Sequence, residues 1–406
     1  MKIIILSAST GGGHMSAANA IKEYLTENGC TSEVVDALEY ISPILNKTVT
    51  ETYEYIATKN PLLWKMIYNS SNKQSLNKLI NIITSLIGKK LMPLINEKNP
   101  DVIVTTHPFT TEMISKLKSS GKISTPLVCI MTDYAPHRTW INEKVDAYIV
   151  ANKDMAYPMA EMGVDPEKIY PFGIPVDDSF FSKLDKNKVM EELEFEKNIP
   201  TILIMAGSYG LANIEKIYFE LREIKNKFQV IIITGKNQKL YDRMQRILEG
   251  KNFSKRQFIL SKLSNLTLKF GKPHVFKRII RKKKQYPKKT KIIYFTNEVN
   301  KYMYISDLII TKPGGLTVSE ALASGLPMAL YDAIPGQEEE NEEFLVSNNM
   351  AIRLNTRESI KEKIEHLLDN PKILNSLKYN CENFDNSHSL ENIFNIIKKL
   401  CGSEKL

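Results

Sequence analysis

Cysteine is rare in this chain of 406 residues, with four cysteines that lie far apart and form no Cys-x-x-Cys pair. This spacing argues against both a disulfide framework and a structural zinc site. No stretch reaches the roughly 18 consecutive apolar residues that a membrane-spanning helix requires. The apolar run Ile3–Leu6 is too short for the core of a signal peptide. We therefore expect a reduced protein of the cytoplasm.

Acidic residues are absent from one long segment. Between Lys251 and Lys291 the chain has fifteen lysines and arginines and no aspartate or glutamate. The whole chain has a net charge of +9, so the remainder carries −6. One segment makes a mildly acidic protein basic, and its partner is expected to be anionic. The segment has no recognised DNA- or RNA-binding motif and its aromatic residues are not in a stacking pattern, which argues against a nucleic acid.

Short strand-like runs alternate with helical stretches in both halves of the chain, a pattern typical of parallel sheets covered by helices on both faces. The breaker-rich connection Tyr170–Pro175 separates the halves. We therefore predict an α/β fold with two facing doubly wound domains. The expected division is a first domain at 1–175, a linker at 176–199, a second domain at 200–375 with a basic insertion at 251–291, and a C-terminal helix and tail at 376–406. The predicted strands are Ile3–Leu6, Glu33–Val35, Val102–Thr105, Leu127–Thr132, Ala147–Val150, Thr201–Met205, Val230–Thr234, Ile292–Phe295 and Leu308–Thr311.

Glycine turns follow three of these strands, at Gly11–Gly13, Gly207–Gly210 and Gly314–Gly315. Each is a candidate anion site, because the free amides at the start of a helix attract negative charge. The first turn also places His14 at the start of a helix, facing the crevice at the strand ends.

The first turn could also belong to a dinucleotide site. Gly11 and Gly13 follow one strand, and Asp36 ends the next. The fingerprint is incomplete, however, because Ser16 stands in the place of the third glycine. A tight strand-to-helix turn accounts for Gly11 and Gly12 equally well.

The stretch Thr311–Pro327 is the most informative part of the sequence. Its helix is expected to end at Gly325, and Glu320 lies on the boundary between the apolar and polar faces of that helix. A carboxylate there can accept hydrogen bonds from both hydroxyls of a ribose, although a solvated helix glutamate is the alternative. The loop Tyr331–Asn341 then brings an amide and carboxylates beside the phosphate site, where they could bind sugar hydroxyls.

These stretches resemble the lipid-directed branch of glycosyltransferase family 28, which includes the monogalactosyldiacylglycerol synthases and the processive diacylglycerol glucosyltransferases. The similarity covers most of the chain except residues 251–291. It implies a GT-B architecture, with two Rossmann-like domains facing each other across a cleft, the acceptor bound by the N-terminal domain and the donor by the C-terminal one. The segments that carry the resemblance are Leu6–His14, Met131–Tyr134 with His137 and Trp140, Thr311–Pro327, and Pro335–Glu338.

The resemblance also implies roles for individual residues. His14 would be the general base or lie beside it, and Asp133 would lie near the reacting centre. His107, which lies at a strand end before Pro108, is expected to be a hydrogen-bonded loop histidine. The implied donor contacts are Glu320 to the ribose, Gln337 and Glu338 to the hexose, Gly207, Ser208, Lys312, Gly314 and Gly315 to the diphosphate, and Phe295 and Thr296 to the uracil.

The implied reaction is the inverting transfer of glucose or galactose from a UDP-sugar to diacylglycerol or a glycosyl-diacylglycerol. Helix amides and Lys312 could stabilise the departing charge, so no metal cofactor is expected. A peptidoglycan-type N-acetylglucosaminyl transferase, a UDP-sugar 2-epimerase and a non-enzymatic nucleic-acid or membrane binder remain the alternatives. The sequence does not distinguish glucose from galactose.

A lipid acceptor requires the protein to reach a membrane, so we expect peripheral association with the inner face of the cell membrane. Two segments could provide it: the basic residues 251–291, attracted to anionic lipid, and Pro61–Tyr68, which mixes aromatic, apolar and basic residues as interfacial helices do. The alternatives are a solvated lysine-rich loop and, for Trp64 and Tyr68, a place in the protein core.

Overall fold

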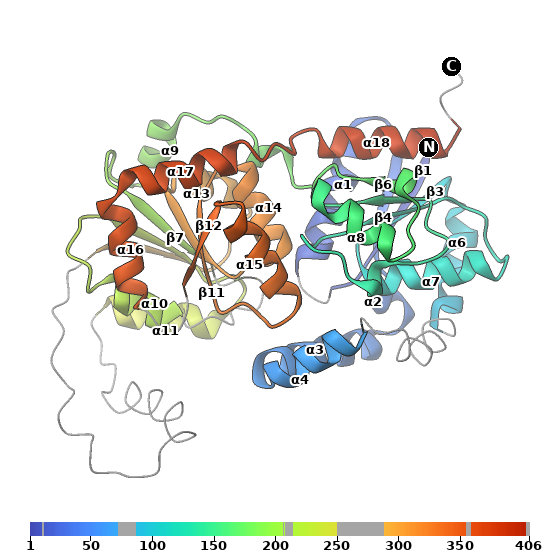
Figure 1. The fold of residues 1–406 in the computed structure, drawn as a ribbon, viewed down its shortest axis with the longest axis horizontal. Helices are drawn as coiled ribbons and strands as arrows, with labels where there is room; N and C mark the ends of the chain where they lie inside the picture. The colour runs from blue at the N-terminus through green and yellow to red at the C-terminus, as the bar shows by residue number, and fades with distance from the viewer. Residues whose placement is uncertain are drawn as a thin grey trace, which may run out of the picture.

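The computed structural model describes residues 1–9, 12–71, 87–205, 207, 214–249, 288–354 and 359–402. These residues form two α/β domains, each built on a six-stranded sheet (Figure 1). All strand pairs in both sheets are parallel. The predicted pair of doubly wound domains is confirmed.

The N-terminal sheet has the strand order β2-β1-β3-β4-β5-β6. Its central strands are apolar runs buried on both faces, as expected for a parallel sheet covered by helices on both sides. Strand β6 lies partly in the breaker-rich connection and was not predicted. The strands are β1 (Lys2–Ser7), β2 (Thr31–Asp36), β3 (Val102–Thr105), β4 (Leu127–Ile130), β5 (Ala147–Ile149) and β6 (Ile169–Tyr170).

The C-terminal sheet has the order β12-β11-β10-β7-β8-β9. The prediction placed β9 three residues too late, because β9 is an edge strand in which only Ile292 is buried. Residues 289–291 of the basic segment belong to this strand, whereas 250–287 lie outside the described residues. The strands are β7 (Thr201–Met205), β8 (Gln229–Ile233), β9 (Lys289–Ile293), β10 (Leu308–Thr311), β11 (Met328–Tyr331) and β12 (Ala351–Leu354).

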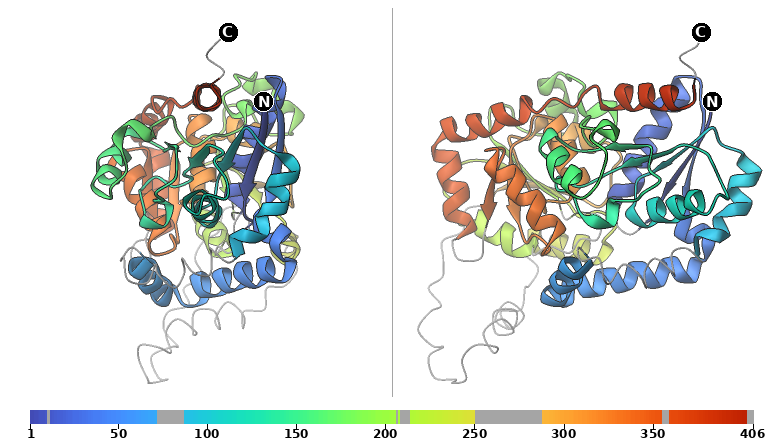
Figure 2. Two further views of the ribbon diagram at one scale, coloured as in Figure 1. Left: turned by 90° about the vertical axis from the view of Figure 1, so that its right-hand side faces the viewer. Right: turned by 45° about the vertical axis from the view of Figure 1, so that its right-hand side comes forward.

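Helices cover the faces of both sheets (Figure 2). In the N-terminal domain the longer helices are α1 (Gly12–Glu27), α2 (Ala37–Ile41), α3 (Pro43–Lys59), α4 (Pro61–Ser71), α6 (Met92–Lys98), α7 (Pro108–Ser119) and α8 (Ala156–Glu161). The helices that come after β6 in the chain are α9 (Lys186–Glu192), α10 (Ile214–Leu221), α11 (Gln238–Leu248), α13 (Val299–Ile305), α14 (Gly315–Ala323), α15 (Gln337–Ser347), α16 (Ile360–Asp369), α17 (Pro371–Glu382) and α18 (Ser389–Leu400).

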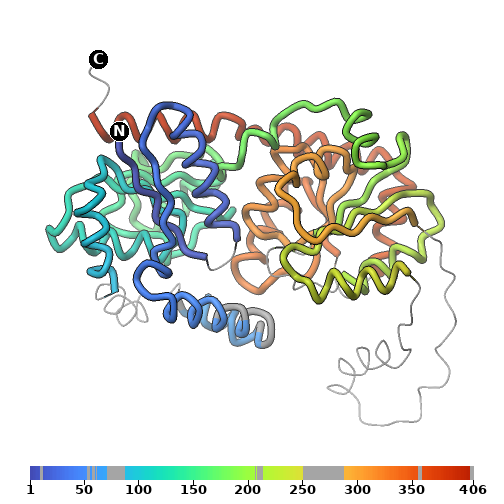
Figure 3. Tube along the Cα trace, turned by 180° about the vertical axis from the view of Figure 1, so that it is seen from behind, coloured from blue at the N-terminus to red at the C-terminus, as the bar shows by residue number. Residues whose placement is uncertain are grey.

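Helix α18 returns to the N-terminal domain and lies along α1, as Figures 1 and 3 show from opposite sides. Its residues Leu390, Ile393 and Ile397 are buried in one cluster with Ile21 and Leu25 of α1. The chain therefore crosses between the domains twice, once after β6 and once between α17 and α18. The two crossings touch, because the Ser389 hydroxyl donates to the Gly173 carbonyl oxygen at 3.0 Å.

The domains meet through buried hydrogen bonds. Asn341 of α15 accepts from the Tyr134 backbone N–H at 2.8 Å and donates to the Pro313 carbonyl at 3.0 Å. The Tyr134 hydroxyl lies 2.8 Å from the Ser319 hydroxyl of α14, and its ring stacks on Phe344. Both Tyr134 and Asn341 are buried. The structure is therefore that of a closed pair of domains.

Gly315, the first residue of α14, allows this closure. A Cβ atom at Gly315 would lie 1.9 Å from the carbonyl oxygen of Thr132, in the other domain. Gly315→Ala should therefore separate the domains and expose the Tyr134 N–H to water. We expect the Tyr134 amide to exchange hydrogen for deuterium roughly tenfold faster or more.

Gly314→Ala is the matched control, since a Cβ atom at Gly314 would meet nothing within 4 Å. Its Tyr134 amide should stay protected. Equal exchange rates in the wild-type protein and Gly315→Ala would show that this contact does not hold the domains together in solution.

Candidate active site

The predicted site residues gather where the carboxyl ends of the two sheets face each other. In the N-terminal sheet, His14 follows β1, Thr106 follows β3, and Thr132 and Asp133 follow β4. These three strands are neighbours in the order β1-β3-β4. Open parallel sheets bind ligands at this edge, where strand order reverses.

His14 is held in one tautomer by its surroundings. Its Nδ1 lies 2.8 Å from the backbone carbonyl oxygen of Thr106 and 2.9 Å from the hydroxyl of Thr132. Because a carbonyl can only accept, Nδ1 carries the hydrogen and the lone pair is on Nε2. Burial lowers the pKa of His14 to about 4, although the carbonyl bond acts in the opposite direction. At neutral pH the ring is therefore a neutral base.

Asp133 joins the two domains. Its carboxylate accepts one hydrogen bond from the Trp140 indole at 3.1 Å and another from the amide nitrogen of Gln337, in the C-terminal domain. Burial raises the pKa of Asp133 to about 6, and these two bonds oppose the shift. Trp140 in turn lies beside His14, with 6.3 Å between ring centres. The two predicted catalytic residues and one predicted hexose contact thus share one site.

The C-terminal side offers a row of turns at neighbouring strand ends. Gly207 follows β7 with a left-handed φ of +68°, and Lys312–Gly315 follow β10, the next strand in the sheet. Strand order reverses between β7 and β10, which makes this edge a good place for a phosphate. Gly314 is the N-cap of α14 and has no side chain that could cap the amides at the start of that helix.

Further along the same edge lie the other predicted donor contacts. Phe295 and Thr296 follow β9, and Phe295 is 48% exposed beneath the ammonium group of Lys236. Gln337 and Glu338 begin α15, which follows β11. The order along the sheet edge is therefore β9, β8, β7, β10, β11, with the predicted uracil contacts at one end and the predicted hexose contacts at the other.

Two carboxylates on this side are perturbed by burial. Burial raises the pKa of Glu320 to about 8, with a smaller contribution from Asp177. Burial also raises the pKa of Glu338, whereas the charge of Lys312 lowers it. Glu338 accepts a hydrogen bond from the Ile334 N–H at 2.7 Å, so part of its carboxylate holds its own turn in place.

Several other predicted residues have structural partners. The carboxylate of Asp36 caps α2 by accepting from the N–H groups of Leu38 and Glu39, which leaves it in a structural role rather than on a dinucleotide. His107 accepts from the Phe109 N–H at 3.2 Å, which confirms the hydrogen-bonded loop histidine, and its ring also meets the edge of His14. Gly11 and Ser208 lie outside the described residues.

Three important residues were missed by sequence reasoning. Thr106 and Thr132 orient His14, and Asn341 joins the domains. Thr132 lies inside the stretch Met131–Tyr134 that was singled out, so that motif was a usable signal. Asn341 ends the stretch Tyr331–Asn341 that was expected to bind sugar hydroxyls, but its role between the domains was not predicted, because Tyr134 is about 200 residues away in the chain. Thr106 had no signal, because His14 is about 90 residues away.

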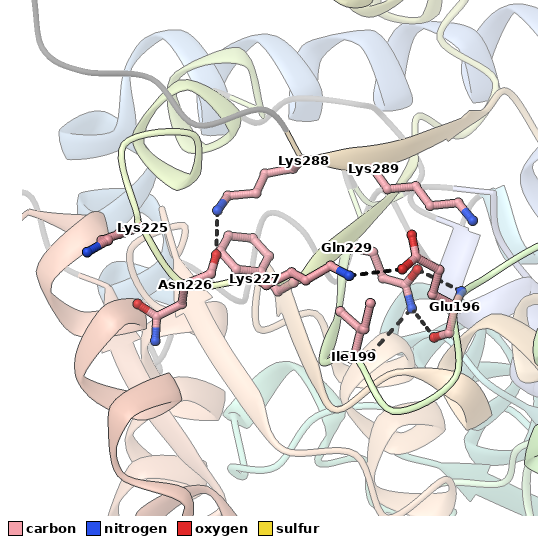
Figure 4. Close-up of a pocket in the computed structure, with 9 residues that line it drawn as sticks. Glu196, Ile199, Lys225, Asn226, Lys227, Gln229, Lys288 and Lys289 are labelled. Atoms are coloured by element: carbon pink, nitrogen blue, oxygen red, sulfur yellow. Dashed lines mark hydrogen bonds and ion pairs between the residues drawn. The ribbon is translucent and has the colours of Figure 1, made fainter.

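A separate hollow of about 270 Å³ lies at the amino ends of β8 and β9, and no predicted site residue lines it (Figure 4). Two of its four lysines are engaged with the protein. Lys288 donates to the backbone carbonyls of Ile224 and Asn226, and Lys227 pairs with Glu196 at 3.1 Å. Among the described residues, no group of three or more His, Cys, Asp and Glu is arranged to hold a metal ion.

The fold occurs in solved structures of low sequence identity. MurG of Acinetobacter baumannii superimposes with a TM-score of 0.59 at 13% identity, over 98% of this chain and 99% of that one. A putative UDP-N-acetylglucosamine 2-epimerase of Listeria monocytogenes gives 0.59 at 15% identity, over 100% and 97%. At these identities the likeness shows the fold alone, which is GT-B as expected.

Comparison with known sequences identifies the enzymes that the chain resembles. Residues 14–176 match the family model of monogalactosyldiacylglycerol (MGDG) synthase, and residues 270–384 match that of glycosyl transferases group 1. The chain is 29% identical to a processive diacylglycerol beta-glucosyltransferase of Bacillus pumilus, over 97% of this chain and 93% of the relative. The corresponding protein of Bacillus subtilis is 27% identical over 98% and 95%. With candidate site residues at the facing strand ends of both domains and similarity along almost its whole length, the chain is similar to the MGDG synthases and processive diacylglycerol glucosyltransferases, as its motifs predicted.

Proposed function

We propose that this protein transfers a hexose, glucose or galactose, from a UDP-sugar to a hydroxyl group of diacylglycerol or a glycosyl-diacylglycerol, with inversion at the anomeric carbon. The hydrogen bond between Asp133 and Gln337 carries the proposal, because it brings the implied reacting centre of one domain to the implied hexose contact of the other. The relatives that match along nearly the whole chain are named processive diacylglycerol beta-glucosyltransferases, which supports the proposal.

In the proposed mechanism His14 is the general base. Its Nε2 removes the proton from the acceptor hydroxyl while the oxygen attacks the anomeric carbon and the bond to the diphosphate breaks. The Thr106 carbonyl, which accepts from Nδ1–H, stabilises the imidazolium that forms. Attack opposite the leaving group gives a β-glycoside from an α-linked donor.

The donor would lie along the C-terminal sheet edge. We assign the uracil to Phe295 and Thr296, the ribose to Glu320, the diphosphate to Gly207, Ser208, Lys312, Gly314 and Gly315, and the hexose to Gln337 and Glu338. The amides of α14 and the charge of Lys312 are proposed to stabilise the leaving diphosphate without a metal.

Transfer to a lipid requires access to a membrane, and we propose peripheral association. Helix α4 exposes Leu62, Leu63, Met66 and Ile67, which lie on one face at helical spacing. Within the described ranges no helix combines the length and apolar character needed to cross a bilayer. The basic segment could add attraction to anionic lipid, although Lys288 and Lys291 at its end donate to carbonyls of the protein itself.

An acceptor assay tests the reaction. Radiolabelled UDP-glucose or UDP-galactose with diacylglycerol should give a labelled glycolipid, whereas a 2-epimerase would convert its UDP-sugar without any acceptor.

His14→Ala should lower the rate 10²–10⁴-fold, the typical effect of losing a general base, and leave UDP affinity by calorimetry nearly unchanged. His388→Ala is the control, since His388 is exposed just before α18 and pairs with Glu391. A near-wild-type rate for His14→Ala would remove His14 from the chemistry.

The rate should depend on the ionisation of Asp133. As the pH falls through about 6, Asp133 takes up a proton and loses one of the two hydrogen bonds it accepts, so kcat/KM should fall. His14 stays neutral down to a pH of about 4, so its ionisation should not change kcat/KM in this range. Asp133→Asn should reduce the rate roughly tenfold or more and abolish the limb near pH 6. A limb that persists in this variant would belong to another group.

Membrane binding can be measured by flotation with vesicles. Replacing Leu62, Leu63 and Met66 with serine should weaken binding at least roughly tenfold, since each is a large apolar side chain. Replacing the exposed Ile373 and Tyr379 of α17 is the matched control and should have little effect. Deleting residues 251–287 should reduce binding to anionic vesicles and its sensitivity to salt. Equal binding of the triple-serine protein would contradict the role of α4.

A further inference from the structure

Helix α4 has two faces with different surroundings. One exposes the apolar residues described above, and the opposite face carries Lys65 and Tyr68, which contact the C-terminal domain. In Figures 1 and 2 the pair α3 and α4 runs beneath both domains, with α4 at the side of the C-terminal domain. A helix of the acceptor domain therefore touches the donor domain directly.

Tyr68 packs on the turn that begins α15. Gly336 has a left-handed φ of +93°, and a Cβ atom there would lie 2.6 Å from Cδ1 of the Tyr68 ring. Only glycine satisfies both this backbone conformation and this contact. The ring therefore lies directly against the residue that precedes Gln337.

Two polar contacts stabilise the start of α15, next to the turn at Gly336. The Tyr68 hydroxyl donates to the Glu340 carboxylate at 2.8 Å, and Lys65 pairs with Glu339 at 2.9 Å. The Glu339 carboxylate also accepts from the Gly336 N–H at 3.2 Å, so it connects α4 to the backbone of the turn. Gly336, Glu339 and Glu340 of the turn and its helix thus all contact α4.

Tyr68 is itself held by the loop that carries the catalytic motif. The His137 Nε2 donates to the Tyr68 carbonyl oxygen at 3.2 Å, and the two rings lie 4.2 Å apart. Nδ1 of His137 accepts from the Thr139 N–H, which fixes this tautomer. His137 lies in the same loop as Asp133 and Trp140. One loop therefore holds Tyr68, which supports Gly336, and also supplies Asp133, which accepts the hydrogen bond from Gln337.

We propose that Tyr68 is a positioning residue for the donor sugar: from the acceptor domain it holds Gly336 and thereby fixes Gln337 in the orientation that binds the hexose. This inference rests on the proposed assignment of the turn to the hexose. The proposal assigns the two parts of the donor, the nucleotide and the sugar, to different sets of contacts. The nucleotide would be bound by the C-terminal domain alone, whereas the sugar would be ordered only when the domains are closed.

The test compares the binding of UDP and of the UDP-hexose that supports turnover. Tyr68→Ala removes the ring that packs on Gly336, so it should leave the Kd of UDP unchanged and weaken UDP-hexose about tenfold through misplacement of Gln337. The KM for the donor should rise by a similar factor. Tyr68→Phe keeps the ring on Gly336 and should recover most of the affinity. Tyr55→Ala, an exposed tyrosine on α3, is the matched control and should behave like the wild type.

Gln337→Ala distinguishes a failure of the hexose assignment from a failure of the positioning role of Tyr68. If it affects UDP and UDP-hexose equally, the turn does not bind the hexose, and both the assignment and the inference are wrong. If Gln337→Ala weakens only UDP-hexose while Tyr68→Ala and Tyr68→Phe bind both ligands as the wild type does, the assignment stands and the positioning role is wrong. An equal loss of both ligands in Tyr68→Ala would indicate a purely structural role.

Discussion

The closed arrangement depends on buried polar groups whose partners lie in the opposite domain. The side chain of Asn341 satisfies a backbone donor of one domain and a backbone acceptor of the other, and it is fully buried. A buried donor or acceptor without a partner costs roughly 1–3 kcal/mol, so a small misalignment of the domains is unfavourable. Full opening exposes the same groups to water, which satisfies them again. Such bonds favour two discrete arrangements over intermediate ones.

Burial sets the ionisation of the site. His14, Asp133 and Glu320 come from different elements, yet burial is the largest cause of the pKa shift in each. Burial disfavours the charged form, which lowers the pKa of a histidine and raises that of a carboxyl group. A neutral imidazole beside a carboxylate that accepts two hydrogen bonds suits proton removal from a hydroxyl.

The sequence predicted the central strands and the local motifs well. The bounds of β3, β7 and β10 agree with the prediction, because these are buried apolar runs between clear breakers. Strands β11 and β12 were not identified, and β9 was misplaced at the polar edge. His14, Gly315 and Gln337 could be singled out because each sits in a short motif at a strand end. The contact of Tyr68 with Glu340 spans 272 positions in the chain, and no local pattern encodes it. The inner face of α4 therefore looked like part of an interfacial helix.

The return of α18 to the first domain has a consequence for the order in which the protein is made. The apolar face of α1, with Ala18, Ile21 and Leu25, is covered by residues of α18, which follow the whole second domain in the sequence. Until α18 is synthesised, the N-terminal domain emerges from the ribosome with that face bare, while the whole second domain is being translated. Exposed apolar surface on a partly made chain favours aggregation and chaperone binding. The first domain to be synthesised is therefore the last to be completed.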